Sequence, residues 1–127
     1  MTDITGFGLM GHVLEMAGGS GCSAIIDYAN VPLIEGLQSY ISQRISPDAT
    51  PRNWNAYSSK VKFEKGVNVM EAFTVLPDPQ TNGGLLISCN PESLKEVQAL
   101  LQANELGAYI NPIGKIIAKA EVPLVVK

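Results

Sequence analysis

The sequence predicts an α+β domain with one β-sheet and helices packed on it. The chain has 127 residues, which is enough for one hydrophobic core and too short for two ordinary domains. Hydrophobic residues make up 46% and charged residues 17%, a globular composition. Short strand-like apolar runs and stripes of helical spacing follow one another without strict alternation, which favours α+β.

Charge and hydropathy exclude two classes of protein. The formal net charge is −3, and no cluster of Lys and Arg provides the basic face of a nucleic-acid binder. No apolar run approaches the roughly 20 residues of a membrane span. The start is acidic and glycine-rich, unlike a signal peptide. We therefore expect a cytoplasmic protein with no nucleic acid and no membrane among its partners.

The first stretch, Met1–Gly11, combines three glycines, two threonines and an aspartate ahead of an apolar run of helical spacing. We expect a polar loop followed by a helix that Thr2, Asp3 or Thr5 caps and that Gly18 and Gly19 end. Free amides in the first turn would attract an anion, and Asp3 could hold a hard cation beside it. This stretch is the best candidate functional site in the sequence.

The middle of the chain is less regular. Residues 22–28 predict a strand, and Pro32 begins a helix with an apolar stripe to residue 41. Residues 42–60 predict a long irregular segment, in which the roles of Arg52 and Asn53 stay open. A short strand is expected over 61–63, and residues 67–76 fit either a helix or a strand.

The second half begins with a cluster of turn formers over 76–84 that leads into a strand over 85–89. Asn90 is expected to cap a helix that starts at Pro91. The buried stripe of this helix would consist of Leu94, Val97, Leu100 and Leu101. Three further strands are expected over 108–110, 113–118 and 122–126.

The two cysteines and the one histidine carry no complete metal or catalytic set. Cys22 and Cys89 lie in apolar, strand-like runs and are interpreted as buried thiols in a reducing compartment, with a disulfide or a metal pair as the alternative. His12 has no Cys or His partner at ligand spacing and is interpreted as an ordinary helix residue. No Ser-His-Asp set or reactive-cysteine context is present.

Two glycine motifs remain as candidate binding loops. Gly6–Gly11 fits the G-x-G-x-x-G pattern, with Asp27 about 20 residues later, as in a dinucleotide-binding turn, although only five residues precede it. Asp78–Gly84 fits either a plain turn or a loop whose glycine amides and Gln80 and Thr81 side chains approach a ligand. The residues therefore offer binding groups without a complete catalytic set.

Both motifs together carry a resemblance. The runs TDITGFGLMGH (residues 2–12) and DPQTNGGLL (residues 78–86), with Arg52 and Asn53 between them, resemble the C-terminal domain of selenophosphate synthetase (selenide, water dikinase). The similarity extends over essentially the whole chain. Asn82 stands where this family usually has serine, which we interpret as a tolerated variant.

The resemblance implies a fold and a reaction. The fold is a single mixed sheet covered by helices, like the C-terminal domain of aminoimidazole ribonucleotide synthetase. The reaction converts ATP, selenide and water to selenophosphate, AMP and phosphate with Mg²⁺. The family's nucleophilic cysteine or selenocysteine, its essential lysine and most of its metal-binding aspartates lie in an N-terminal domain. The chain alone is therefore expected to contain no catalytic residue and to be inactive, with its own N-terminal domain as partner and a homodimer as the full-length state.

The resemblance also assigns residues at the interface of the two domains. Asp3 is the expected magnesium ligand. The expected ATP and phosphate contacts are Thr2, Thr5, Gly6, Gly8, Gln80, Thr81, Gly83 and Gly84. Two alternatives stay open: the same domain of another superfamily member (aminoimidazole ribonucleotide synthetase, thiamine-monophosphate kinase or a hydrogenase maturation factor), and a stand-alone binding or dimerisation module.

Overall fold

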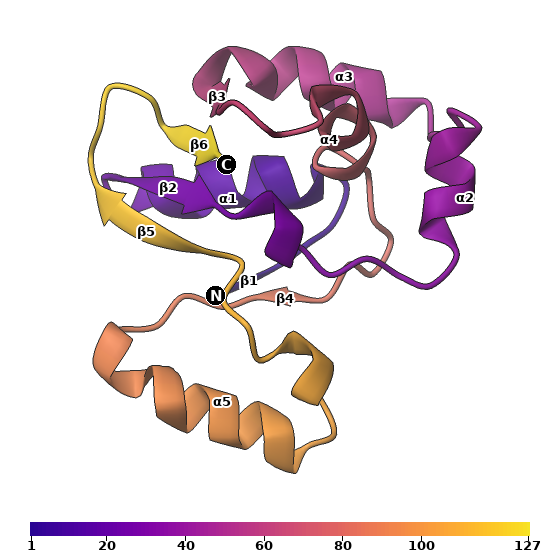
Figure 1. Cartoon of the computed structure of the whole chain (residues 1–127). Helices are drawn as coiled ribbons and strands as arrows, with labels where there is room; N and C mark the ends of the chain where they lie inside the picture. Colours follow the sequence, from indigo (N-terminus) through magenta and orange to yellow (C-terminus); the bar gives the residue numbers. More distant parts are fainter.

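The computed structural model describes residues 1–127 and has the predicted α+β fold (Figure 1). The strands are β1 (Thr2–Asp3), β2 (Cys22–Ile26), β3 (Val61–Phe63), β4 (Leu85–Leu86), β5 (Gly114–Ala118) and β6 (Leu124–Val126). The α-helices are α1 (Gly8–Gly19), α2 (Leu37–Ser42), α3 (Ala49–Tyr57), α4 (Val69–Val75) and α5 (Leu94–Ala103). None of the helices has the length and apolar character needed to cross a bilayer.

The main sheet has four strands in the order β3-β6-β2-β5 and is mixed, as expected. The strand β2 runs antiparallel to β5 and parallel to β6, and β6 runs parallel to β3. A separate two-stranded ladder joins β1 and β4, which the sequence did not predict. Because β1 belongs to this ladder, the glycine motif after it does not follow a strand of the main sheet, as a dinucleotide-binding turn would.

The core lies between α1 and one face of the main sheet. Alternate residues of β2 and β6 point to this face and are buried, as the two-residue period of a strand requires: Ala24, Ile26, Leu124 and Val126. From α1 come the buried side chains Met10, Val13 and Ala17. In Figure 1, α1 lies behind the sheet, while α3 packs against α1 and α4.

The predicted cap of the first helix is wrong. Phe7 occupies the N-cap position without a side-chain hydrogen bond, so none of Thr2, Asp3 and Thr5 caps α1. Thr2 and Asp3 are instead engaged in β1. The helix ends at Gly19, within the predicted glycine pair, and the left-handed backbone that follows the helix is at Gly21, with φ +65°.

The prediction of a long irregular segment over 42–60 is wrong from residue 49 onwards, because this part forms α3 and a following 3₁₀ turn, Ser58–Lys60. Pro51 is tolerated because it lies in the first turn of α3, where its missing N–H would have no intrahelical partner. Trp54 anchors the helix to the core, with ring centroids 5.5 Å from Phe63 and 5.1 Å from Phe73. The preceding helix, α2, begins only at Leu37, after Gly36 with φ +81°.

The structure resolves the ambiguous stretch over 67–76 as the helix α4. Asn68 caps it, since its side-chain oxygen accepts a hydrogen bond of 3.3 Å from the Glu71 amide. The Tyr28 hydroxyl donates to Oε1 of Glu71 at 3.2 Å and so joins α4 to the turn after β2. Burial, reinforced by the Glu71 carboxylate, raises the pKa of Tyr28.

The second half departs from the predictions in several places. β4 ends at Leu86 rather than residue 89, and residues 107–109 form a 3₁₀ turn instead of a strand. α5 follows a 3₁₀ turn at Pro91–Ser93, and the Asn90 side chain makes no cap hydrogen bond. The predicted buried stripe of α5 is wrong, because the helix has no buried residue and Leu100 is 64% exposed. The two remaining strands, β5 and β6, confirm the predicted runs.

The cysteines are free thiols, which excludes the alternative of a disulfide between them in this structure. The interpretation of two buried thiols is nevertheless wrong. Cys22 is half-buried at the start of β2, whereas Cys89 is exposed because β4 ends before it.

Candidate functional site

The structure brings the two predicted glycine motifs together. β1 and β4 pair antiparallel, with Asp3 opposite Leu85. Past the ladder, the Ile4 amide donates to the Gly84 carbonyl at 2.9 Å and the Gly83 amide donates to the Ile4 carbonyl at 3.0 Å. The Gln80 amide then donates to the Thr5 carbonyl at 3.1 Å. We call residues 4–8 the first loop and residues 77–84 the second loop.

Two glycines allow this close approach. Gly8 has φ +69°, and a Cβ built on it would lie 2.6 Å from the Pro77 carbonyl carbon. A Cβ on Gly83 would lie 2.8 Å from the Ile4 carbonyl oxygen. Both positions therefore require glycine for the contact between the loops. By contrast, a Cβ on Gly6 would meet no atom within 4 Å, so this position faces open space.

The joined loops keep several backbone amides free. The amides of Gly6 and Phe7 in the first loop donate to no backbone oxygen, and neither do those of Thr81 and Asn82 in the second loop. All four residues are exposed. Because α1 begins directly after Phe7, the positive end of its helix dipole adds to the attraction for an anion there. The two motifs together therefore provide hydrogen-bond donors for an anion.

His12 lies in α1, as expected, and its side chain supports the first loop. Its side chain is 7% exposed, and its Nε2 accepts a hydrogen bond of 3.1 Å from the Thr5 amide. Thr5 Oγ1 lies 3.2 Å from the same nitrogen. Because Nε2 accepts, the neutral ring carries its proton on Nδ1, which faces the Glu15 carboxylate at 3.5 Å.

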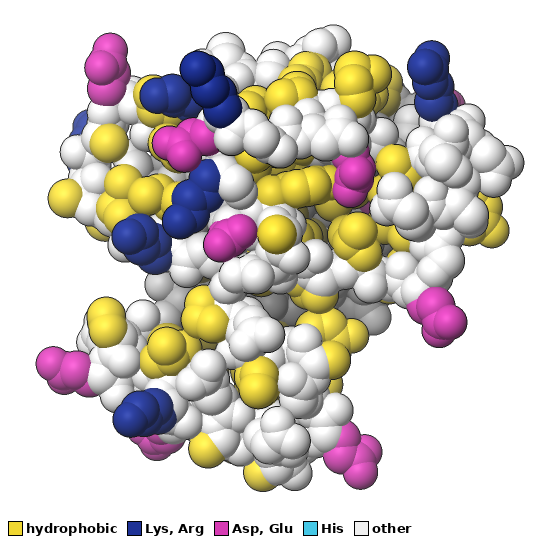
Figure 2. Space-filling view, in the orientation of Figure 1, with side chains coloured by type: hydrophobic (Ala, Val, Ile, Leu, Met, Phe, Trp, Pro, Cys, Tyr) yellow, Lys and Arg dark blue, Asp and Glu magenta, His cyan; other side chains and the backbone are white.

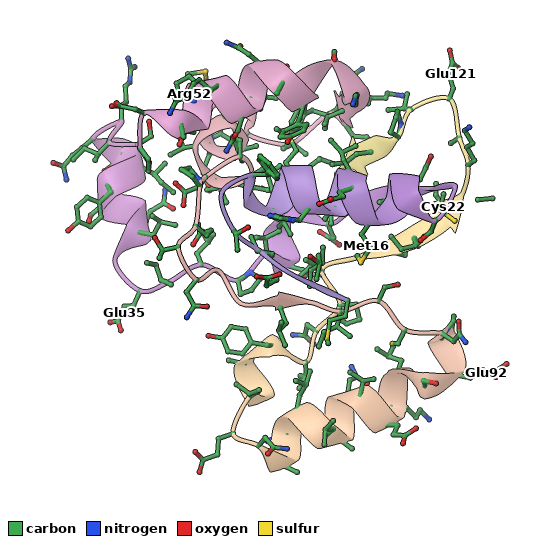
Figure 3. All side chains as sticks on the ribbon, turned by 180° about the vertical axis from the view of Figure 1, so that it is seen from behind. Met16, Cys22, Glu35, Arg52, Glu92 and Glu121 are labelled. Carbon is green, nitrogen blue, oxygen red and sulfur yellow. The ribbon has the colours of Figure 1, made fainter.

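Asn53 joins the first loop to the second from α3. Its Nδ2 donates to the Gly6 carbonyl at 2.8 Å and to the Pro77 carbonyl at 2.9 Å. The sequence alone assigns no role to Asn53, because the residues around it do not show the pattern of a helix. Its neighbour Arg52 is exposed, lies on α3 (Figure 3) and has no carboxylate within ion-pair distance.

In the second loop, Gln80 is engaged within its own motif. Its Nε2 donates to Oδ2 of Asp78, and both residues are half-buried. Burial raises the pKa of Asp78. The Gln80 side chain thus orders the loop, whereas the Thr81 side chain is exposed and free for a ligand.

A magnesium site made by this chain alone does not fit the structure. No group of three or more His, Cys, Asp or Glu side chains gathers anywhere in the chain, and Asp3 is exposed without a side-chain hydrogen bond. Mg²⁺ in phosphate-transferring sites is held by one or two carboxylates together with phosphate oxygens and water. Asp3 therefore fits as one carboxylate of a site completed by other groups.

The fold and the joined loops define a class of domain, and comparison with protein families identifies it. The model for "AIR synthase related protein, C-terminal domain" matches residues 1–127, and the chain belongs to this family. Among curated proteins, the chain is 42% identical to the selenide, water dikinase of Bordetella bronchiseptica over 119 residues, which is 94% of this chain and 33% of that enzyme.

The selenide, water dikinases of Pseudomonas putida and Pseudomonas aeruginosa are each 40% identical over 119 residues, again 94% of this chain and 33% of each enzyme. The chain thus spans about a third of the length of the curated relatives it matches.

Proposed function

We propose that this chain is the C-terminal domain of a selenophosphate synthetase, an enzyme that converts ATP, selenide and water to selenophosphate, AMP and phosphate. The observation that carries the proposal is the hydrogen-bonded joining of the two motifs, which places free amides from residues 6–7 and 81–82 on one pair of loops. Relatives that are about 40% identical over most of the chain are named selenide, water dikinase. These names favour the selenium reaction over the reaction of another superfamily member.

The proposed task of the loops is to bind and orient phosphate oxygens. Donors fixed before the substrate arrives stabilise developing negative charge without reorganising during the reaction. The amides of Gly6, Phe7, Thr81 and Asn82 fill this role, assisted by the hydroxyls of Thr2 and Thr81. The Thr5 hydroxyl lies 3.2 Å from His12 Nε2 and holds the loop instead. Gly8, Gly83, Gly84 and Gln80 keep the two loops at their separation, so their expected ligand role is indirect.

Asp3 would supply one carboxylate to a magnesium ion shared with the rest of the enzyme. When bound, the ion neutralises charge on the transferring phosphoryl group. The nucleophile and the essential lysine would come from an N-terminal domain, and the full-length enzyme would act as a cytoplasmic homodimer. The 127-residue chain alone would show no selenide-dependent AMP formation, because it provides binding groups only.

A domain exchange tests this proposal. The segment of the Pseudomonas aeruginosa selenide, water dikinase that matches this chain is replaced by residues 1–127, and AMP formation is measured with and without selenide. We expect selenide-dependent activity within about tenfold of the parent enzyme, a barrier difference of roughly 1.4 kcal/mol. A chimera that melts like the parent but forms no AMP with selenide would contradict the proposal.

A further inference from the structure

We infer that Asn53 is a positioning residue of the phosphate-binding loops, fixing the direction in which the first loop presents its amides. The inference rests on the proposed function, and it assigns a role to a residue that touches no substrate itself.

Both hydrogens of the Asn53 side-chain amide are used. An asparagine NH₂ group has two donors, and here they reach the Gly6 carbonyl at 2.8 Å and the Pro77 carbonyl at 2.9 Å. The two acceptors belong to different loops, 47 and 24 residues away in sequence. One side chain therefore bridges the two loops.

The bond to Gly6 also sets the orientation of a free donor. The Gly6 carbonyl and the Phe7 amide belong to one planar trans peptide unit, in which C=O and N–H point in opposite directions. Holding the Gly6 oxygen towards α3 therefore turns the Phe7 N–H away from α3. That amide is one of the free donors of the first loop.

No other hydrogen bond holds this peptide unit. The backbone hydrogen bonds between the loops end on Ile4 and Thr5 in the first loop, and no backbone amide donates to the Gly6 oxygen. Gly6 has open space around its Cβ position, and glycine backbones rotate readily. Without Asn53 the Gly6–Phe7 peptide would lose its only hydrogen bond, and the packing of the Phe7 ring against Tyr57 and His12 would remain as its contact outside the loop.

Asn53 is itself well anchored. The next residue, Trp54, stacks on Phe63 with an interplanar angle of 22° and meets Phe73 edge-on. A polar side chain fixed on a packed helix gives a more precise orientation than one carried by a loop.

The test compares Asn53→Asp with Asn55→Asp in the 127-residue chain. Both changes add the same charge to α3, but Asn55 is exposed and makes no hydrogen bond. Asn53→Asp keeps the size of the side chain while removing both donors. The readout is the ¹⁵N–¹H spectrum of the Gly6, Phe7, Thr81 and Asn82 amides during titration with inorganic pyrophosphate, with Asn53→Ala as the variant that adds no charge.

We expect pyrophosphate to shift these amides in the wild-type chain and in Asn55→Asp, and to bind roughly 10- to 100-fold more weakly to Asn53→Asp and Asn53→Ala. In the chimeric enzyme the two Asn53 variants should lower kcat/KM by a similar factor at an unchanged melting temperature. Equal titrations of wild type and both Asn53 variants, or no shift in the wild type, would overturn the inference. If these shifts follow expectation while the wild-type chimera is inactive, the proposed reaction fails and the positioning role stands.

Discussion

His12 and Asn53 hold the first loop from two sides. The His12 ring accepts from the Thr5 amide at the start of the loop, and the Asn53 amide donates to the Gly6 carbonyl one residue later. One side chain is an acceptor and the other a donor, so neither can replace the other. The loop is therefore fixed by side chains from two helices, α1 and α3, whose packing depends on the core.

Asp78 leads to a prediction about pH. Burial raises the pKa of this carboxyl above its ordinary value. A raised native pKa means that the native state binds the proton more tightly than the unfolded chain. Its contribution to stability is complete below about pH 3.8 and is lost as the pH rises through the native pKa. Asp78→Asn removes this dependence, and Asn keeps an oxygen for the Gln80 amide.

We therefore expect the melting temperature of wild type relative to Asp78→Asn to fall as the pH rises from 3 towards neutral, by roughly a few degrees at most for a half-exposed group. Thermal unfolding over this range measures it. The matched control is Asp48→Asn, which changes an exposed carboxylate. A wild-type advantage that grows with pH would contradict the assigned sign.

The helix α3 connects the core to the site. Its Trp54 packs between two phenylalanines, and its Asn53 reaches both loops. Phe7 meets Tyr57 of the same helix edge-on, with centroids 6.2 Å apart. An element that the sequence patterns did not reveal thus places the loops relative to the sheet.

Truncating Trp54 should therefore destabilise the fold. We expect Trp54→Ala to lower the free energy of unfolding by about 2–4 kcal/mol, somewhat less than for a fully buried tryptophan. Urea unfolding measures the change. Asn55→Ala, on the exposed side of the same helix, should alter stability by no more than about 0.5 kcal/mol. Equal effects of the two substitutions would show that α3 is not anchored as described.

At the scale of the whole molecule, the chain divides into a packed body and a loosely attached helical unit. The unit comprises residues 90–111 around α5, lies apart from the sheet in Figure 1 and has a Gln98–Ile110 hydrogen bond of 3.0 Å within it. Large apolar side chains are exposed on or beside it: Leu85, Ile87, Leu100, Leu106 and Tyr109. Figure 2 shows hydrophobic side chains at the surface of both parts.

This division predicts uneven protection from hydrogen exchange. The amides of α5 should exchange at least roughly tenfold faster than those of α1, because few buried apolar contacts oppose local opening of α5. Hydrogen-exchange mass spectrometry of peptides covering 94–103 and 8–19 provides the comparison. Equal protection of the two helices would contradict the division into body and unit.

Local sequence patterns predicted the fold class, the two motif loops and four of the strands, β2, β3, β5 and β6. Apolar runs and turn residues indicate such local structure directly. The helix α3 was not predicted, because Pro47, Pro51 and several Asn and Ser residues outweigh its apolar positions, and its stability comes from Trp54 packing on distant residues. The roles of Asn53 and His12 could not be predicted from the sequence either. Their roles depend on hydrogen bonds across the fold, which no sequence spacing encodes.

The site itself was predicted in part. The two motifs were identified as candidate binding loops, and the structure joins them. The assignment of Asp3 to magnesium and of the glycines and threonines to phosphate stays a prediction. The structure removes one competing role for Asp3, since Phe7 rather than Asp3 occupies the N-cap of α1.

Turnover of the Asp3→Asn chimera as a function of magnesium tests the central claim most directly. Asp3 is exposed and its side chain makes no hydrogen bond, so asparagine should leave the melting temperature unchanged. If its carboxylate holds the shared ion, selenide-dependent AMP formation should fall by roughly 100-fold or more, a loss of about 2.7 kcal/mol of transition-state stabilisation. Asp48→Asn should retain full turnover. Wild-type turnover by Asp3→Asn at ordinary magnesium concentration would contradict the claim that the joined loops and Asp3 form the phosphate and metal side of the enzyme.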